Sequence, residues 1–259
     1  MIGDFARIEA AVRGRPVTVL GNGPTARQWD GTLPARGAVA TVNAGLALLA
    51  ELSLRASQTT GPGPNARKTL HREPPESYRA DLVWVQDERF LPRRAETLLP
   101  HLEASRPSGA GGAAQNQRPV RRAPLLAVNE RLLAQLPPGI ARQAIGFRML
   151  GYEGFSRDPR IGVFHGYNAI FGLLQLLAAA GASSLELYGV PMLYWSTETR
   201  FDQAKRGVDV DLHRASDQVA LTAWAIDLLR KDDISITVHG ESALKRATLP
   251  GAGACGSRQ

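Results

Sequence analysis

Short apolar runs recur along the chain and alternate with longer segments of helical character. Strands are expected where β-branched and other apolar residues follow one another without interruption, at residues 17–20, 38–42, 82–85, 125–128, 185–190 and 234–238. Helices are expected at residues 4–12, 44–54, 167–180 and 216–231. Because strands that alternate with helices are typical of a parallel sheet covered on both faces, the pattern predicts an α/β, Rossmann-like fold.

Two internal stretches break this alternation. Residues 57–78 are rich in turn residues, proline and basic side chains, and residues 105–124 are rich in Gly, Ala, Gln, Arg and Pro. Such compositions bury too little apolar surface to order themselves, so we expect two flexible loops and a short disordered tail at 247–259. The length of 259 residues and the hydrophobic fraction of 44% predict one domain over 1–259.

Composition also limits the class of protein. A single cysteine, Cys255, excludes an intramolecular disulfide and a cysteine metal cluster. No apolar run is long enough to cross a bilayer, and the acidic residues Asp4 and Glu9 stand where a secretory signal would be basic and then apolar. We therefore expect a soluble, cytoplasmic protein.

The net charge of +7 raises the question of a nucleic-acid partner. Much of the arginine excess falls in the two expected loops, where it is neither interleaved with aromatic residues nor laid along a helix face. We therefore expect no nucleic-acid binding. A solvated basic surface of this kind is attracted to anionic lipid or to a phosphorylated acceptor, which predicts peripheral contact with the inner face of a membrane.

The turn Gly21-Asn22-Gly23-Pro24-Thr25 follows the first expected strand directly. Open α/β sheets bind phosphates at this position, because glycines admit a close ligand and the following N–H groups attract anions. The alternative is a tight turn without a ligand. A dinucleotide-binding motif is disfavoured because Ala26 takes the third glycine position and Asn43 ends the second strand, and the P-loop pattern is absent.

These residues carry a resemblance to a known family. The turn at 21–25, Asn43, the helix start at Gly166-Tyr167, the strand at 185–190, Phe201-Asp202 and His213 occur in the order seen in the bacterial sialyltransferases of glycosyltransferase family 42. The chain also resembles the wider group that includes archaeal 6-hydroxymethylpterin pyrophosphokinase. The resemblance implies an inverting, metal-independent transfer of sialic acid or a similar acidic sugar from a CMP-sugar to a glycan or glycolipid hydroxyl, as in lipopolysaccharide or glycan biosynthesis.

The resemblance also implies roles for single residues. His213 matches the proposed general base and Tyr194 lies near a tyrosine that binds the leaving phosphate; both types of side chain suit a reaction without a metal or other cofactor. Donor-nucleotide contacts are expected from Gly21, Asn22, Gly23, Thr25, Asn43, Gln86 or its neighbour Asp87, and, at the start of the central helix, His165 and Gly166.

Differences from the family keep other hypotheses open. Phe164-His165-Gly166 stands where the sialyltransferases have Thr-Ser-Gly, so His165 either donates to a phosphate or caps the helix. The Asp209-Val210-Asp211 pattern is of the kind that binds Mg²⁺, and it underlies the alternative of an ATP- and Mg-dependent pyrophosphokinase-like enzyme. A third hypothesis is a catalytically inactive relative that retains nucleotide binding.

Overall fold

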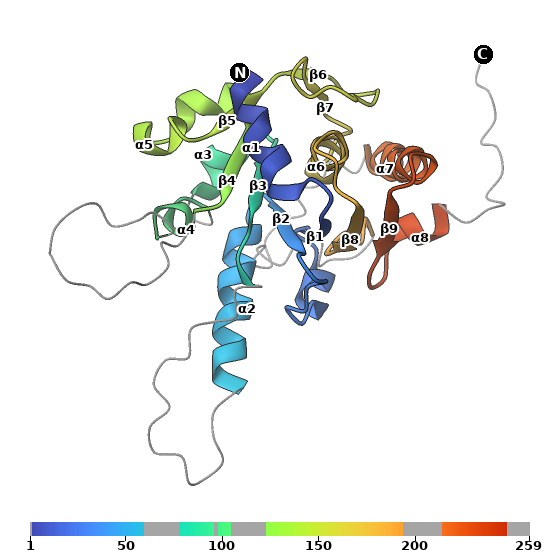
Figure 1. The fold of residues 1–259 in the computed structure, drawn as a ribbon, viewed down its shortest axis with the longest axis horizontal. Helices are drawn as coiled ribbons and strands as arrows, with labels where there is room; N and C mark the ends of the chain where they lie inside the picture. Colours follow the sequence, from blue (N-terminus) through green and yellow to red (C-terminus); the bar gives the residue numbers. More distant parts are fainter. Residues whose placement is uncertain (1, 60–77, 96–97, 105–122, 194–213, 248–259) are drawn as a thin grey trace, which may run out of the picture.

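A parallel sheet of seven strands forms the centre of the computed structural model (Figure 1). The structure describes residues 2–59, 78–95, 98–104, 123–193 and 214–247. In spatial order the strands are β5 (Ile145–Phe147), β4 (Leu125–Asn129), β3 (Leu82–Val85), β2 (Ala38–Val42), β1 (Pro16–Leu20), β8 (Ser184–Tyr188) and β9 (Ser235–Val238). The chain thus extends the sheet from β1 in one direction and later adds β8 and β9 on the other side. The predicted α/β, Rossmann-like fold is confirmed.

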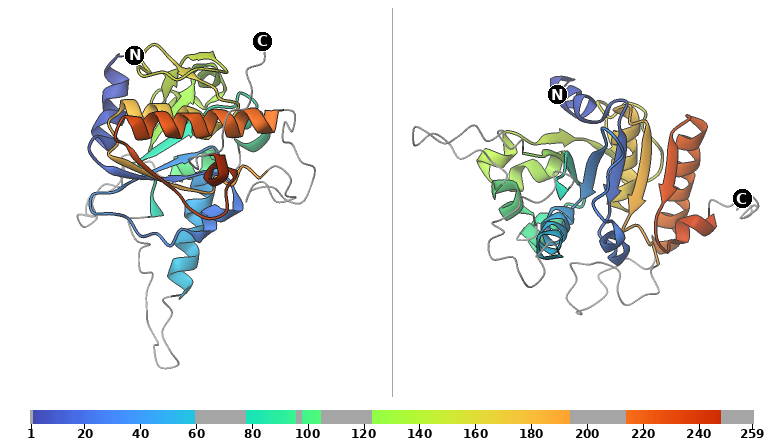
Figure 2. Two further views of the ribbon diagram at one scale, coloured as in Figure 1. Left: turned by 90° about the vertical axis from the view of Figure 1, so that its right-hand side faces the viewer. Right: turned by 60° about the horizontal axis from the view of Figure 1, so that its bottom comes forward.

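Helices cover both faces of the sheet (Figures 1 and 2). On one face lie α1 (Ile2–Val12), α6 (Ala169–Ala179) and α7 (Ala215–Lys231), and on the other lie α2 (Gly45–Thr59), α3 (Phe90–Arg94), α4 (Leu99–Ala104), α5 (Pro138–Ala141) and the 3-10 helices η1 (Pro24–Gln28) and η4 (Glu130–Gln135). The short helix α8 (Ala243–Ala247) follows β9 and packs beside α7. Figure 2 shows α7 lying along the sheet while α2 projects away from the opposite face.

Alternation of side chains along the strands divides the core into two apolar clusters. In β3, Leu82 and Trp84 join the cluster under α1, α6 and α7, whereas Val83 and Val85 join the cluster that contains α2. Successive residues of a strand point to opposite faces, and helices cover both faces here, so all four side chains are buried. This is why β3 reads as a continuous apolar run.

The predicted boundaries agree with the structure to within a few residues for most elements. The largest difference is α2, which continues to Thr59, past the expected end at residue 54. The short strands β5, β6 (Met149–Gly151) and β7 (Val163–Phe164) were not predicted, because strands of two or three residues carry no periodicity. Most of the expected loops at 57–78 and 105–124, and of the tail at 247–259, lie outside the described residues.

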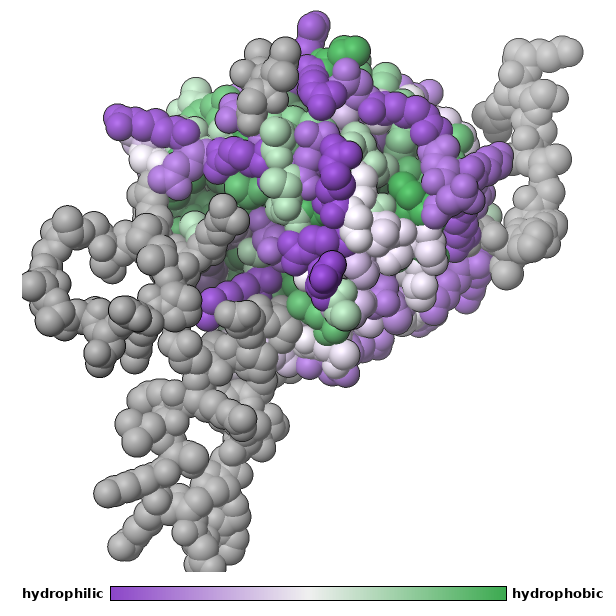
Figure 3. All heavy atoms as spheres, viewed as in Figure 1, coloured by the Kyte–Doolittle hydropathy of each residue, from purple (hydrophilic) through white to green (hydrophobic). Residues whose placement is uncertain are grey.

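None of the helices in the described ranges is long and apolar enough to span a membrane. On the face seen in Figure 3, hydrophilic residues predominate and the apolar areas between them are small. The exposed large apolar side chains in the described ranges are Leu54, Tyr152, Ile161 and Trp224.

A buried amide holds the segment before α6 onto that helix. Gln175 of α6 has no exposed surface, and its Oε1 accepts hydrogen bonds from the backbone N–H groups of Ser156 (2.9 Å) and Phe164 (3.0 Å). Its Nε2 donates to the carbonyl oxygens of Phe164 (2.9 Å) and Phe171 (3.1 Å). One side chain therefore satisfies several buried backbone groups of a segment that has little regular structure.

We predict that Gln175→Leu lowers the free energy of unfolding by about 2–4 kcal/mol, because each buried backbone group left unpaired costs about 1–3 kcal/mol. Urea unfolding followed by circular dichroism measures the change. Gln143→Leu is the matched control, since Gln143 is exposed, and it should change stability by no more than about 0.5 kcal/mol. Equal stability of the two variants would contradict the prediction.

Candidate functional site at the switch in strand order

The order of the strands reverses at β1, which lies between β2 and β8. In open α/β sheets, ligands bind at the carboxyl ends of the strands beside such a switch point. Here the loop after β1 contains Gly21, Asn22 and Gly23, and the loop after β8 begins with Gly189. The two loops touch: the N–H of Gly21 donates to the carbonyl oxygen of Tyr188, and the N–H of Gly23 donates to that of Gly189, both at 2.8 Å.

The glycines of these loops allow the close contact. A Cβ atom on Gly21 would lie 2.3 Å from the carbonyl oxygen of Gly189, and one on Gly23 would lie 2.2 Å from Cδ of Pro191. Gly189 itself has φ +70°, a conformation that disfavours other residues. Packing between loops thus explains the glycine pattern, and the N–H groups of Gly21 and Gly23 are directed at the protein. A ligand here would meet the side chain of Asn22 instead.

Unpaired polar atoms gather at this edge of the sheet. In the ranges that the structure covers, six buried side-chain N or O atoms have no hydrogen-bond partner, and only Thr18 Oγ1 lies within a strand. The other five lie in segments that follow strands: Asn22 Oδ1 and Thr25 Oγ1 after β1, Asn43 Oδ1 after β2, His165 Nδ1 after β7 of the two-stranded sheet, and His239 Nε2 after β9. Buried polar atoms are normally paired, so a group of unpaired ones indicates a place where a ligand or water completes the hydrogen bonding.

Asn43 occupies the end of β2 in a strained conformation. Its φ is +49°, which asparagine tolerates better than most residues, and its N–H donates to the carbonyl oxygen of Trp84 at 2.9 Å. The helix α2 begins two residues later at Gly45, where a Cβ atom would lie 1.4 Å from Oγ1 of Thr41. The N-terminus of this 15-residue helix therefore lies beside Asn43 at the carboxyl edge of the sheet.

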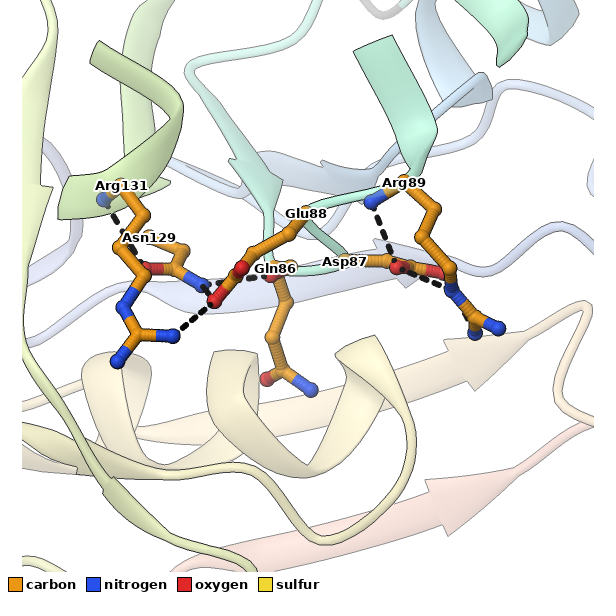
Figure 4. Close-up of polar contacts among 6 residues, drawn as sticks. All are labelled: Gln86, Asp87, Glu88, Arg89, Asn129 and Arg131. Atoms are coloured by element: carbon orange, nitrogen blue, oxygen red, sulfur yellow. Dashed lines mark hydrogen bonds and ion pairs between the residues drawn. The ribbon is translucent and has the colours of Figure 1, made fainter. Parts of the chain in front are cut away.

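Gln86, which follows β3, binds the backbone of the segment that carries His165. It is 1% exposed, its Nε2 donates to the carbonyl oxygens of His165 (2.8 Å) and Asn168 (3.0 Å), and its Oε1 accepts from Trp84 Nε1 at 3.3 Å. Figure 4 shows its side chain pointing toward α6, away from the charged residues that follow it. The expected contact of Gln86 with a donor remains a prediction, and the amide already has protein partners on both its nitrogen and its oxygen.

The two residues after Gln86 each form an ion pair with an arginine (Figure 4). Asp87 accepts hydrogen bonds from the backbone N–H and the guanidinium of Arg89, at 2.9 to 3.2 Å. Glu88 pairs with Arg131 at 3.0 Å. Burial acts to raise the pKa of Asp87, but the hydrogen bonds and charge of Arg89 outweigh it, so this pKa lies below its ordinary value. The end of β3 thus carries a carboxylate at neutral pH.

His165 lies beside this carboxylate with an unpaired, buried Nδ1. Burial lowers the pKa of His165 below its ordinary value; the charge of Asp87 opposes the shift and that of Arg89 adds to it. The imidazole is therefore neutral at pH 7. It does not cap α6: Asn168 does, because its Oδ1 accepts the N–H of Phe171 at 2.9 Å. Gly166 (φ +56°) forms the bend between His165 and the cap.

Tyr152 and Tyr167 form an aromatic pair next to His165 that sequence reasoning missed. Their rings stack with centroids 4.8 Å apart and planes at 15°, and the Tyr152 ring lies 5.2 Å from the imidazole of His165. The pairing depends on the ribbon of β6 and β7, whose ladder continues into these residues: His165 N–H donates to the carbonyl oxygen of Gly151 (2.7 Å) and Gly166 N–H to that of Tyr152 (2.8 Å). No local sequence pattern marks this contact.

A second group of polar residues lies at the ends of β8 and β9. The rings of Tyr188 and His239 are stacked, with centroids 4.0 Å apart, and His239 Nε2 lies 3.7 Å from Glu186 Oε2. Burial, followed by the charges of Glu186 and Asp30, raises the pKa of Tyr188. Gly240 lies close to Thr25 of η1, so the unpaired hydroxyl of Thr25 belongs with this group rather than with Asn43.

Several predicted residues lie outside the described residues: Tyr194, His213, and the Asp209 and Asp211 of the acidic alternative. Within the described ranges, no group of three or more His, Cys, Asp or Glu side chains could hold a metal ion. Of the expected nucleotide contacts, the fold brings together Asn22, Asn43 and Gln86, which follow the adjacent strands β1, β2 and β3. Gln86 in turn bonds to the backbone of His165, which follows β7.

The fold and this edge define an α/β protein with a Rossmann-like parallel sheet and a candidate ligand site at its switch point. Comparisons with protein-family models, curated proteins and solved structures found no match to the chain.

We predict that Gly21→Ala destabilises the protein by about 3 kcal/mol, because the new Cβ would overlap a backbone oxygen that cannot move without separating the two loops. Gly14→Ala is the control: Gly14 has φ +66° but open space around its Cβ position, so only backbone strain of about 1 kcal/mol is expected. Chemical denaturation measures both. A Gly21→Ala variant as stable as Gly14→Ala would refute the packing role.

The lowered pKa of His165 predicts a dependence of stability on pH. In the unfolded chain His165 has an ordinary pKa of about 6.5, so on acidification it binds a proton at a higher pH than it does in the folded protein. The contribution of neutral His165 is therefore fully present above that pH and decreases as the pH falls toward the lower, folded pKa. We expect the wild type to lose stability relative to His165→Gln between pH 7 and pH 5. Parallel stability curves for the two proteins would exclude the shift.

Proposed function

We propose that the protein transfers a sugar from a nucleotide-activated donor, a CMP-linked sugar, to a hydroxyl group of a glycan or glycolipid. The observation that carries the proposal is the row of unpaired buried polar atoms along the carboxyl edge, Asn22 Oδ1, Asn43 Oδ1 and His165 Nδ1. They come from, or lie beside, the ends of the adjacent strands β1, β2 and β3. Two strand spacings cover about 10 Å, which is the scale of a nucleotide.

The chemistry of these groups suits a nucleotide better than a purely apolar ligand. Asparagine oxygens accept hydrogen bonds from ribose hydroxyls or from an exocyclic amino group, while the amide nitrogens of the same side chains can donate to phosphate. The N-terminus of α2 beside Asn43 adds the positive end of a helix dipole, which favours an anion. We therefore assign the phosphate to the ends of β1 and β2.

In the proposed reaction, the acceptor oxygen forms a bond to the anomeric carbon while the bond from that carbon to the phosphate oxygen breaks. The acceptor proton passes to a base and CMP departs with the electron pair of the broken bond. The family resemblance assigns the base to His213 and support of the leaving phosphate to Tyr194. This chemistry needs a crevice that holds the nucleotide and leaves room for a hydroxylic acceptor beside it.

Isothermal titration tests the nucleotide site directly. We expect CMP to bind more tightly than UDP or ATP, with no requirement for Mg²⁺. Tight binding of ATP only in the presence of Mg²⁺ would instead support the pyrophosphokinase-like alternative. Indifference to CMP, CDP, UDP and ATP would remove the nucleotide proposal altogether.

Asn22→Asp and Asn43→Asp test which side chains contact the nucleotide. Each change is nearly isosteric, and aspartate also tolerates the left-handed conformation of Asn43, but the added charge repels phosphate. We expect each variant to raise the dissociation constant of CMP at least about tenfold, which corresponds to about 1.4 kcal/mol. Gln143→Glu, which adds the same charge at an exposed position after α5, should leave affinity unchanged.

His213→Ala tests the assigned base. Removing a general base lowers a rate by about 10²- to 10⁴-fold, so we expect a loss of that order in turnover with nearly unchanged CMP affinity. The wild-type rate should also decrease at acid pH as the imidazole is protonated. Wild-type turnover by His213→Ala would show that the base is another residue.

A further inference from the structure

The exposed ring of Tyr152 stands at the border of the site. Tyr152 is 56% exposed. Its partner Tyr167 also contacts Arg214, whose guanidinium carbon lies 5.0 Å from the centre of the Tyr167 ring. Tyr152 is therefore the exposed member of a stacked group whose other members, Tyr167 and Arg214, lie just before α6 and α7. A large exposed aromatic ring with rigid support is a surface on which another ring can stack.

The backbone beneath the rings is held in one conformation. Tyr167 has φ +58°, which is unusual for a bulky residue, and Gly166 before it has φ +56°. The strain persists because Gln86 donates to the carbonyl oxygens on both sides of this pair, those of His165 and Asn168. Strained backbone that the surrounding structure fixes is a feature of binding sites. The ring of Tyr152 thus stacks on a partner, Tyr167, whose backbone is held in place.

The polar groups next to the rings select the charge of a ligand. Asp87 is ionised and Glu88 adds a second carboxylate, while His165 is neutral and presents its unpaired Nδ1. Arg89 and Arg131 pair with the two acids, so the group has no net positive charge that would attract a phosphate or a carboxylate. Hydroxyl groups, in contrast, can donate to the carboxylate and can either donate to or accept from a neutral imidazole.

We propose that Tyr152, backed by Tyr167 and flanked by His165 and Asp87, binds an uncharged pyranose ring. The ring stacks its C–H face on Tyr152 and directs hydroxyls at His165 and Asp87. If the proposed sugar transfer holds, on which this assignment rests, the uncharged ring belongs to the acceptor, because the anionic donor binds at the ends of β1 and β2. The site then has a donor half that favours anions and an acceptor half that does not attract them.

Saturation-transfer NMR on the full chain tests the proposal with methyl β-galactoside and methyl β-glucoside as neutral probes and methyl β-glucuronide as the anionic one. We expect the neutral probes to bind the wild type and Tyr152→Phe alike, and Tyr152→Ala at least about fivefold more weakly. Trp224→Ala is the control, since Trp224 is also exposed but lies on α7 against Phe155. Asp87→Asn should strengthen binding of the glucuronide relative to the neutral probes.

Neutral probes that ignore the wild type, or that bind Tyr152→Ala as well as the wild type, would overturn the proposal. So would a loss of CMP affinity in Tyr152→Ala, because the ring would then hold the nucleobase. If the wild type binds the neutral probes through Tyr152 but does not bind CMP, the proposed nucleotide site fails while the saccharide site stands. The two proposals are therefore separable by the same set of proteins.

Discussion

The contact between the loops after β1 and β8 is the constraint on which the arrangement of the candidate site depends. β1 is bonded to β2 on one side and to β8 on the other, so two loops leave adjacent strand ends and must share the same space. Hydrogen bonds from Gly21 and Gly23 hold them together, and glycines let the backbones approach. The register that pairs Leu20 with Tyr188 continues through this contact and determines which side chains emerge at the edge.

The edge has two electrostatic characters. Beside β1 and β2, unpaired asparagine oxygens and the N-terminus of α2 offer hydrogen-bonding groups without a fixed negative charge. Beside β3, ionised Asp87 lies close to a neutral histidine and an exposed tyrosine ring. A ligand that is anionic at one end and hydroxylated at the other matches this order. The proposed reaction between a nucleotide-linked sugar and a second saccharide brings together two such partners.

Buried amides position the second half of the site. Gln86 and Gln175 each bond several backbone groups of the segment between β6 and α6, and Asn168 caps the helix while its Nδ2 donates to Thr222 Oγ1 of α7 at 3.0 Å. The contacts of Gln86 and Asn168 with these groups connect residues 54 to 82 positions apart, and those of Gln175 connect residues 11 and 19 positions apart. They stabilise a stretch of largely irregular backbone, because each hydrogen bond pairs a buried polar group that would be costly to leave unpaired.

The sequence alone determined the elements whose signal is local. Buried strands such as β2 and β3 appear as apolar runs, and α1 ends just before Gly14 (φ +66°), where glycine and proline predicted the end of a helix. The fold class and the place of the switch-point turn were therefore predictable. Only the tertiary structure decided what the residues of that turn contact. It showed that the glycines pack against the β8 loop, that Gln86 supports the loop before α6, and that Tyr152 stacks on Tyr167 beside His165. Those relations arise from contacts between segments distant in the chain, and periodicity along a sequence carries no information about which distant segments meet.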